Sequence, residues 1–112
     1  DPWGAKAARS SMGSIFPTPV LTAGAAIERL VGERCPGRWL AAGDGERTYS
    51  DPIWAGGVAV IIGSEGHGAT GWGIGLATGG GRIPLAPGVE SLNASVAAAV
   101  LMFEARRQRG AL

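Results

Sequence analysis

The chain ends in a helix that is apolar almost all the way round, which is unusual in so short a protein. The run from Ala94 to Phe103 contains one serine and no charge, and the first acidic residue follows at Glu104. A surface helix normally carries a single apolar stripe, whereas a helix that is apolar on most sides is buried on several of them. The 112 residues offer little protein for that purpose. We therefore expect this helix to be wrapped by its own chain or covered by a second subunit.

The segment before this helix predicts a short strand, Ile83 to Leu85, and then a turn rich in Pro and Gly. The turn ends in Ser-Leu-Asn, and we expect the helix to run from Ser91 to Arg109 with Ser91 as its N-cap. Asparagine is not favoured in the first turn of a helix, because its side chain competes for backbone hydrogen bonds. Asn93 is therefore a candidate functional residue.

The rest of the chain alternates helical and extended patterns. Strands that alternate with helices indicate a parallel sheet in an α/β architecture, here within a single domain over residues 1–112. Each interior glycine costs a helix about 1 kcal/mol, so the glycine-rich segment from Ala69 to Gly81 is expected to form at most a short helix. Its possible anchors are Trp72, Ile74 and Leu76. The other predicted elements are a helix at Ala5 to Met12, a helix at Ala23 to Arg34 capped by Thr22, a strand at Arg38 to Ala42, a loop at Glu46 to Gly57 and a strand at Val58 to Ile62.

Composition excludes several classes of protein. Hydrophobic residues make up 46% of the chain and the net charge is +1, which is typical of a packed domain and gives no overall signal for nucleic acid. The longest apolar run is about half the length of a membrane span. One cysteine and one histidine cannot build a zinc site, so no metal is expected. A single cysteine also fits a reducing cytoplasm.

A glycine-rich turn, Gly-Ser-Glu-Gly-His-Gly at residues 63–68, follows the apolar strand that begins at Val58. Ligands of open α/β sheets bind beyond the carboxyl ends of the strands, where glycines let backbone amides approach them closely. An ordinary tight turn explains the glycines equally well. Glu65 can likewise serve to cap a following helix, and a lone His67 is more often a turn residue than a catalyst.

Taken together, three stretches resemble the SpoU/TrmH-like branch of the SPOUT-class RNA ribose 2′-O-methyltransferases. They are the strand and turn at residues 58–68, the strand-turn-helix at residues 82–109, and the segment at residues 1–20, which is similar to the linking region of the ribosomal-RNA branch. The resemblance covers essentially the whole chain. It implies an enzyme that binds S-adenosyl-L-methionine and methylates a ribose 2′-hydroxyl of RNA, with ribosomal RNA expected rather than transfer RNA.

The resemblance also implies roles for individual residues. Asn93 and Glu65 match positions that the family places at its active site. Lys6 and Arg9 match a segment near the path of the RNA, although a solvated helix explains them equally well. We interpret Arg106, Arg107 and Arg109 as a solvated tail. The expected cofactor-binding residues are Ala41, Gly63, Ser64, Ile83, Pro84, Ser91 and Leu92.

The family fold is a parallel α/β sheet with flanking helices and a C-terminal deep trefoil knot, usually paired as a homodimer through the C-terminal helix. Family members carry a further N-terminal strand, helix and first motif with a catalytic arginine and an asparagine, none of which occurs in this sequence. The resemblance therefore implies a truncated domain and incomplete catalysis by this chain alone. A non-catalytic dimerisation or RNA-binding fragment, and an unrelated nucleotide-binding α/β domain, remain the alternatives.

Overall fold

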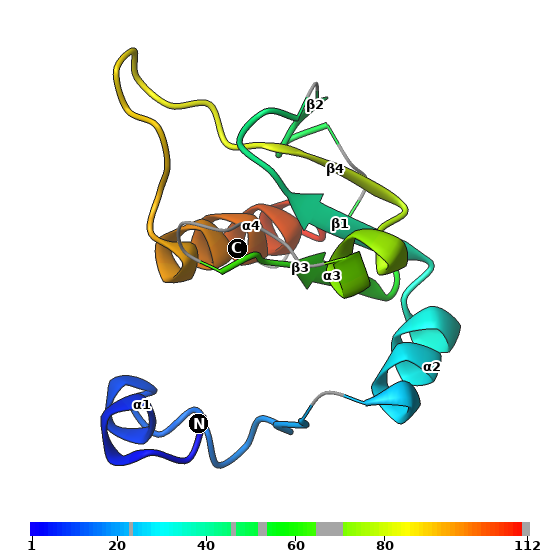
Figure 1. The fold of residues 1–112 in the computed structure, drawn as a ribbon, viewed down its shortest axis with the longest axis vertical. Coiled ribbons are helices and arrows are strands. Elements are labelled where there is room, and N and C mark those ends of the chain that lie inside the picture. Colours follow the sequence, from blue (N-terminus) through cyan, green and yellow to red (C-terminus); the bar gives the residue numbers. More distant parts are fainter. Residues whose placement is uncertain (23, 46, 52–53, 65–70, 111–112) are drawn as a thin grey trace.

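The structure, a computed structural model, describes residues 1–22, 24–45, 47–51, 54–64 and 71–110 (Figure 1). Among these residues, none of the helices combines the length and the apolar composition that crossing a membrane requires. The elements in chain order are α1 (Ala5–Ser10), α2 (Ala25–Arg34), β1 (Gly37–Ala41), β2 (Arg47–Thr48), β3 (Val58–Ile61), α3 (Gly71–Leu76), β4 (Gly79–Arg82) and α4 (Ala94–Gln108).

The four described strands form one parallel sheet in the order β2-β4-β1-β3. Trp39 in β1 lies opposite Val60 of β3 on one side and Gly79 of β4 on the other. The predicted parallel α/β sheet is therefore confirmed. The prediction of a loop over residues 46–57 was wrong in part, because β2 lies within it and pairs with β4. Strand β4 thus lies between β1 and β2, which both precede it in the chain.

Helix α4 packs on the sheet next to β3, while α1 lies apart from the sheet at the end of an extended segment (Figure 1). The core between sheet and helix consists of Trp39, Trp54 and Leu101, all almost fully buried. The two indole rings meet edge to face, with centroids 5.8 Å apart, a geometry that aromatic pairs prefer. The Arg47 guanidinium lies 5.6 Å from the centre of the Trp39 ring on the sheet, at cation–π distance.

Strand β4 consists of three glycines and Arg82. The predicted strand at Ile83 to Leu85 is wrong, because the observed strand ends just before it. The glycines of β4 have a steric reason. A Cβ atom on Gly81 would overlap the Arg47 carbonyl oxygen and come within 2.6 Å of Cζ2 of Trp39. A Cβ on Gly80 would lie 2.6 Å from the Leu40 carbonyl oxygen. At positions 80 and 81 only glycine fits against the neighbouring strands, although glycine has low intrinsic strand propensity.

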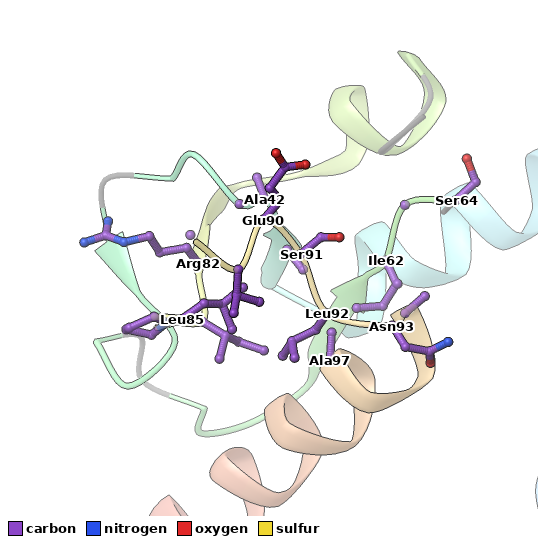
Figure 2. A pocket seen from close by; sticks show the side chains of 18 residues that line it. Ala42, Ile62, Ser64, Arg82, Leu85, Glu90, Ser91, Leu92, Asn93 and Ala97 are labelled. Carbon is purple, nitrogen blue, oxygen red and sulfur yellow. The ribbon is translucent and has the colours of Figure 1, made fainter. Parts of the chain in front are cut away.

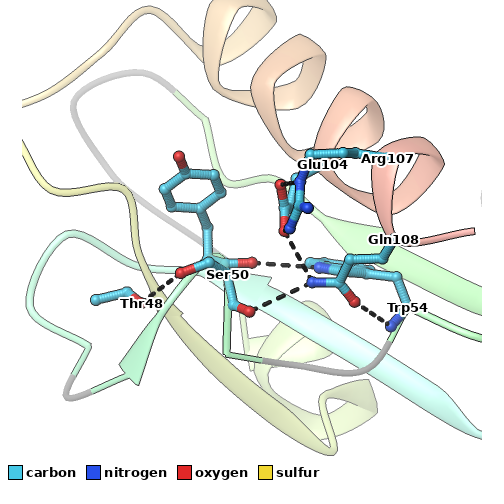
Figure 3. A network of polar contacts seen from close by, with 7 residues as sticks. Thr48, Ser50, Trp54, Glu104, Arg107 and Gln108 are labelled. Carbon is cyan, nitrogen blue, oxygen red and sulfur yellow. Dashed lines mark hydrogen bonds and ion pairs between the residues drawn. The ribbon is translucent and has the colours of Figure 1, made fainter. Parts of the chain in front are cut away.

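The C-terminal turn of α4 anchors the segment that precedes β3 (Figure 3). Gln108 accepts a hydrogen bond from the Trp54 backbone N–H at 3.1 Å and donates to the Ser50 carbonyl at 3.3 Å. Arg109 donates to the carbonyls of Trp54 and Gly56 at 2.6 and 2.7 Å. The interpretation of this end of the helix as a solvated tail is therefore wrong for Arg109, whose guanidinium holds the neighbouring backbone.

Glu104 is the buried acid of this network. Arg107 donates to both of its carboxylate oxygens at 2.8 Å, and Gln108 donates to one of them at 2.8 Å. These hydrogen bonds, from Arg107 first and then Gln108, lower the pKa of Glu104 from 4.5 to about 2. The same pair raises the pKa of Arg107. Because both charges are held in one hydrogen-bonded geometry, Glu104 is ionised throughout the neutral range.

Only Leu101 and Glu104 of α4 are buried, so within this chain the helix is not covered on several sides. Val96, Met102 and Phe103 expose 49%, 59% and 61% of their surface. Of the two expected kinds of cover, the chain itself does not supply the one for these three side chains, which leaves a second subunit as the alternative for them. Their apolar surface is open to a further protein.

Two predicted helix boundaries also differ. Helix α1 ends at Ser10, because Met12 takes a positive φ of 52° and leaves helical geometry before Gly13. Helix α2 begins after Gly24 with no side-chain cap, so Thr22 is not its N-cap. The glycine-rich segment does form only a short helix, α3, as predicted. Two of its three proposed anchors are wrong, since Trp72 and Ile74 are 46% and 57% exposed.

Replacing Gly81 with alanine should lower the free energy of unfolding by about 1–3 kcal/mol or more, because the new methyl group has no room beside Arg47 and Trp39. Gly79→Ala is the matched control in the same strand. There a Cβ would meet the Trp39 ring at an ordinary 3.9 Å, so stability should change by less than about 1 kcal/mol. Chemical denaturation measures both, and equal stabilities for the two variants would contradict the steric account.

The lowered pKa of Glu104 predicts a pH dependence of stability. A carboxyl whose pKa falls on folding stabilises the protein above its unfolded pKa, and this contribution is lost as the pH falls from 4.5 to about 2. Glu104→Gln should therefore be less stable than the parent chain at neutral pH, and the difference should vanish near pH 2. Denaturation across this range measures it, with Glu33→Gln on α2 as an exposed control. A difference that does not change with pH would contradict the assignment.

Candidate functional site

A pocket of about 1020 Å³ opens at the carboxyl ends of β1, β3 and β4 (Figure 2). The segment from residue 84 to the start of α4 forms its remaining wall, so three stretches that are distant in the sequence meet here. This is the edge at which open α/β sheets bind their ligands. The described lining residues are Ala41, Ala42, Gly43, Ile62, Gly63, Ser64, Gly81, Arg82, Ile83, Pro84, Leu85, Val89, Glu90, Ser91, Leu92, Asn93, Ala94 and Ala97.

Backbone hydrogen bonds hold the strand ends together at the edge of the pocket. The parallel pairing of β1 with β4 continues past the strands through a hydrogen bond from the Ala42 N–H to the Gly81 carbonyl at 2.9 Å. Gly45 then closes a turn by donating to the Ala42 carbonyl at 3.2 Å. Because the glycine backbone of β4 packs closely against β1, the ends of these two strands lie side by side at the pocket. A ligand here would meet peptide groups at the strand ends and aliphatic side chains around them.

All seven residues expected to bind the cofactor line this pocket, and Asn93 lines it with them. The proposed roles of these residues stay predictions, because their placement alone does not show binding. Glu65 and His67 lie outside the described residues. Lys6 and Arg9 are on α1, which the structure places apart from the sheet, so neither lines the described pocket.

Asn93 has a structural role that the sequence did not indicate. Its side-chain oxygen accepts hydrogen bonds from the backbone N–H groups of Ser95 and Val96 at 2.9 and 3.3 Å, so Asn93 is the N-cap of α4. The predicted cap at Ser91 is wrong, because the helix begins three residues later, at Ala94. Capping therefore fixes the Asn93 side chain through its oxygen, at a residue that also lines the pocket.

Sequence reasoning missed ten of the lining residues. Most are immediate neighbours of predicted ones, such as Ala42 and Ile62, and their positions at the strand ends were the available signal. Three come from the turn before α4, namely Leu85, Val89 and Glu90. A turn has no sequence periodicity from which the direction of a side chain can be predicted. Across the residues the structure describes, no group of three or more His, Cys, Asp or Glu side chains is placed to hold a metal ion.

The charged lining residues that the structure describes are Arg82 and Glu90. The Arg82 guanidinium donates to the Gly45 carbonyl and thereby ties the end of β4 to the turn after β1. Figure 2 shows the Arg82 and Glu90 side chains extending in different directions. The remaining lining residues are mostly aliphatic or glycine, and Ser64, Ser91 and Asn93 add neutral polar side chains. The site therefore suits a ligand with an apolar part and a few polar groups.

A parallel α/β domain with its pocket at this edge defines a class of ligand-binding fold, and comparison with known proteins identifies the family. The model of the SpoU rRNA Methylase family matches residues 1–103. The chain therefore belongs to this family, as its resemblance to the SPOUT-class enzymes implied.

Relatives of known name match about half of the chain. The mouse mitochondrial rRNA methyltransferase 3 is 50% identical over 63 residues, which are 52% of this chain and 15% of that protein. The tRNA (guanosine(18)-2′-O)-methyltransferase of Thermus thermophilus is 51% identical over 51 residues, which are 46% of this chain and 26% of that protein. The chain thus matches well under half the length of either relative.

Solved structures match nearly the whole chain. The SpoU methyltransferase AviRb from Streptomyces viridochromogenes, in complex with AdoMet, superposes with a TM-score of 0.85 at 28% identity, covering 97% of this chain and 46% of that one. The AdoMet-bound rRNA methyltransferase from Sinorhizobium meliloti gives a TM-score of 0.81 at 26% identity, covering 96% and 42%. Both neighbours share the fold of this chain and are longer than it.

The capping role of Asn93 can be tested by substitution. Asn93→Ala removes the cap and should lower the free energy of unfolding by about 1 kcal/mol, whereas Asn93→Asp keeps a capping oxygen and should retain most of the stability. Thermal denaturation of both variants measures this. Equal losses in the two variants would contradict a capping role for the side-chain oxygen.

Proposed function

We propose that this chain is the S-adenosyl-L-methionine-binding part of an RNA 2′-O-ribose methyltransferase, with ribosomal RNA as the substrate. The observation that carries the proposal is the pocket at the strand ends, where Ala41, Gly63, Ile83 and Leu92 come together. Family membership and the two AdoMet-bound structural neighbours support it. Because the chain covers only part of its relatives, the activity of the whole protein is part of the proposal.

The lining fits the chemistry of such a cofactor. The adenine and ribose would lie against Ile62, Ile83 and Leu92, which offer apolar contact, while the peptide groups at the strand ends would bind the polar edges of the base. S-adenosylmethionine, when bound, supplies a methyl group on a positively charged sulfur. The part of this chain is to hold that group in near-attack geometry, which contributes much of the rate in reactions of this kind.

The chemical step also needs a base for the proton of the attacking ribose hydroxyl. We assign Asn93 a positioning role, because it lines the pocket wall at the residue that caps α4. Glu65 is proposed as the second residue of the active site, next to Ser64. Lys6 and Arg9 on α1 are proposed to contact RNA phosphates, since exposed cations suit backbone contacts.

We further propose that α4 mediates a homodimer and that the chain forms a deep trefoil knot in a cytoplasmic protein. The exposed apolar side chains Val96, Met102 and Phe103 support the dimer, because a partner helix would cover them. The position of β4 between β1 and β2 supports the knot, since that strand has to enter between two segments already joined in the chain. The cytoplasm is inferred from the single cysteine.

Isothermal titration calorimetry of the full chain tests the cofactor site. S-adenosylmethionine should bind with micromolar affinity, and Leu92→Asn should weaken binding about tenfold or more, because an apolar contact with the ligand is replaced by a polar amide. Leu21→Asn is the matched control, since Leu21 is 62% exposed and lies outside the pocket lining.

Two outcomes would contradict the proposal. If S-adenosylmethionine does not bind to the parent chain, the proposed cofactor site is wrong. Binding of ATP but not of S-adenosylhomocysteine would show that the pocket takes a different nucleotide.

A further inference from the structure

We propose that Glu90 makes this pocket selective for the positively charged methyl donor over its neutral product. The inference rests on the proposed function, and it assigns a specificity-determining residue that neither the sequence pattern nor the family resemblance indicated. It begins from the charge distribution in the pocket, where Glu90 and Arg82 are the charged side chains of the described lining.

The two charged lining residues are not equivalent. The Arg82 guanidinium donates to the Gly45 carbonyl, so its charge is directed toward the turn after β1. The Glu90 side chain is exposed at the wall formed by the turn before α4, and it extends away from Arg82 in Figure 2. Among the described residues, no hydrogen bond or ion pair occupies the Glu90 carboxylate. The acid therefore contributes a negative charge to the pocket that the neighbouring base does not neutralise by direct contact.

The donor and its product differ most in charge. S-adenosylmethionine carries a sulfonium, an ammonium and a carboxylate, hence one net positive charge. After methyl transfer the sulfur is a neutral thioether, and S-adenosylhomocysteine carries no net charge. The aliphatic lining contacts both molecules alike, apart from the transferred methyl group. A negative charge at the wall lowers the free energy of the donor complex and leaves that of the product complex nearly unchanged.

The expected size of the effect is modest, because Glu90 is exposed to water. Two unit charges about 4 Å apart in bulk water attract by about 1 kcal/mol, which corresponds to about a fivefold change in affinity. Salt screens charges at such an exposed site, so the preference should shrink as ionic strength rises. A preference of this size lets the product leave while the donor still binds, which favours turnover.

The test is calorimetric titration of the full chain and its Glu90→Gln variant at low salt with three ligands. These are S-adenosylmethionine, S-adenosylhomocysteine and sinefungin, in which a protonated amine replaces the methylsulfonium. The variant should bind both cationic ligands about fivefold more weakly and bind S-adenosylhomocysteine as before, and high salt should reduce the difference. Glu28→Gln on α2 removes the same charge away from the pocket lining and should change none of the three affinities.

The outcomes separate the two levels of the proposal. If the parent chain binds none of the ligands, the cofactor site itself is wrong. If it binds them and Glu90→Gln weakens all three equally, or weakens none, the charge selectivity is wrong while the cofactor site stands. Thermal denaturation of the variant shows that it is folded, and an unfolded variant is replaced by Glu90→Ser, for which the same pattern of affinities is expected.

Discussion

The close approach of the β4 backbone to its two neighbouring strands is the constraint on which the rest of this structure depends. Strand β4 lies between β1 and β2, and no Cβ can be placed at Gly81 without overlapping the Arg47 carbonyl or the Trp39 ring. The opposing loop meets the same limit, since a Cβ on Gly45 would overlap Gly81. Glycines here cost conformational entropy on folding, and the indole packed over them compensates through buried area.

That constraint also positions the pocket. Because β4 is held deep in the sheet, the residues that follow it, Ile83 and Pro84, are delivered to the same edge as the ends of β1 and β3. The chain then returns to α4, whose first turn is fixed by the Asn93 cap. At its other end α4 is anchored by Gln108 and Arg109 to the segment before β3. The C-terminal end of the helix is thus tied to the segment before β3, and its N-terminal end begins at a residue of the pocket wall.

Sequence patterns predicted the parts of this protein whose signals are local. Periodicity and propensity predicted the strand in the apolar run at residues 58–62, the short helix in the glycine-rich segment and the parallel sheet. The residues expected around a cofactor lie together because each follows or begins an element at the same edge of the sheet. The errors arose where tertiary contact overrides propensity. Three consecutive glycines have no strand propensity, yet they pair as β4, while the apolar Ile83 to Leu85 segment lines the pocket instead.

The sequence by itself determined the class of fold, the family and the three stretches that meet at the site, because these depend on hydrophobic periodicity and on motifs that are contiguous in the chain. Only the tertiary structure decided that Asn93 caps α4, that Glu104 is a buried acid held by Arg107, and that Glu90 lies at the pocket wall. The burial of Glu104 and the place of Glu90 depend on segments that are far apart in the sequence, and the Asn93 cap depends on the residue at which the helix begins. The contact of Glu104 with Arg107 is local, but its burial is not. A one-dimensional pattern does not contain these properties, because burial, hydrogen bonding and charge separation are set by packing.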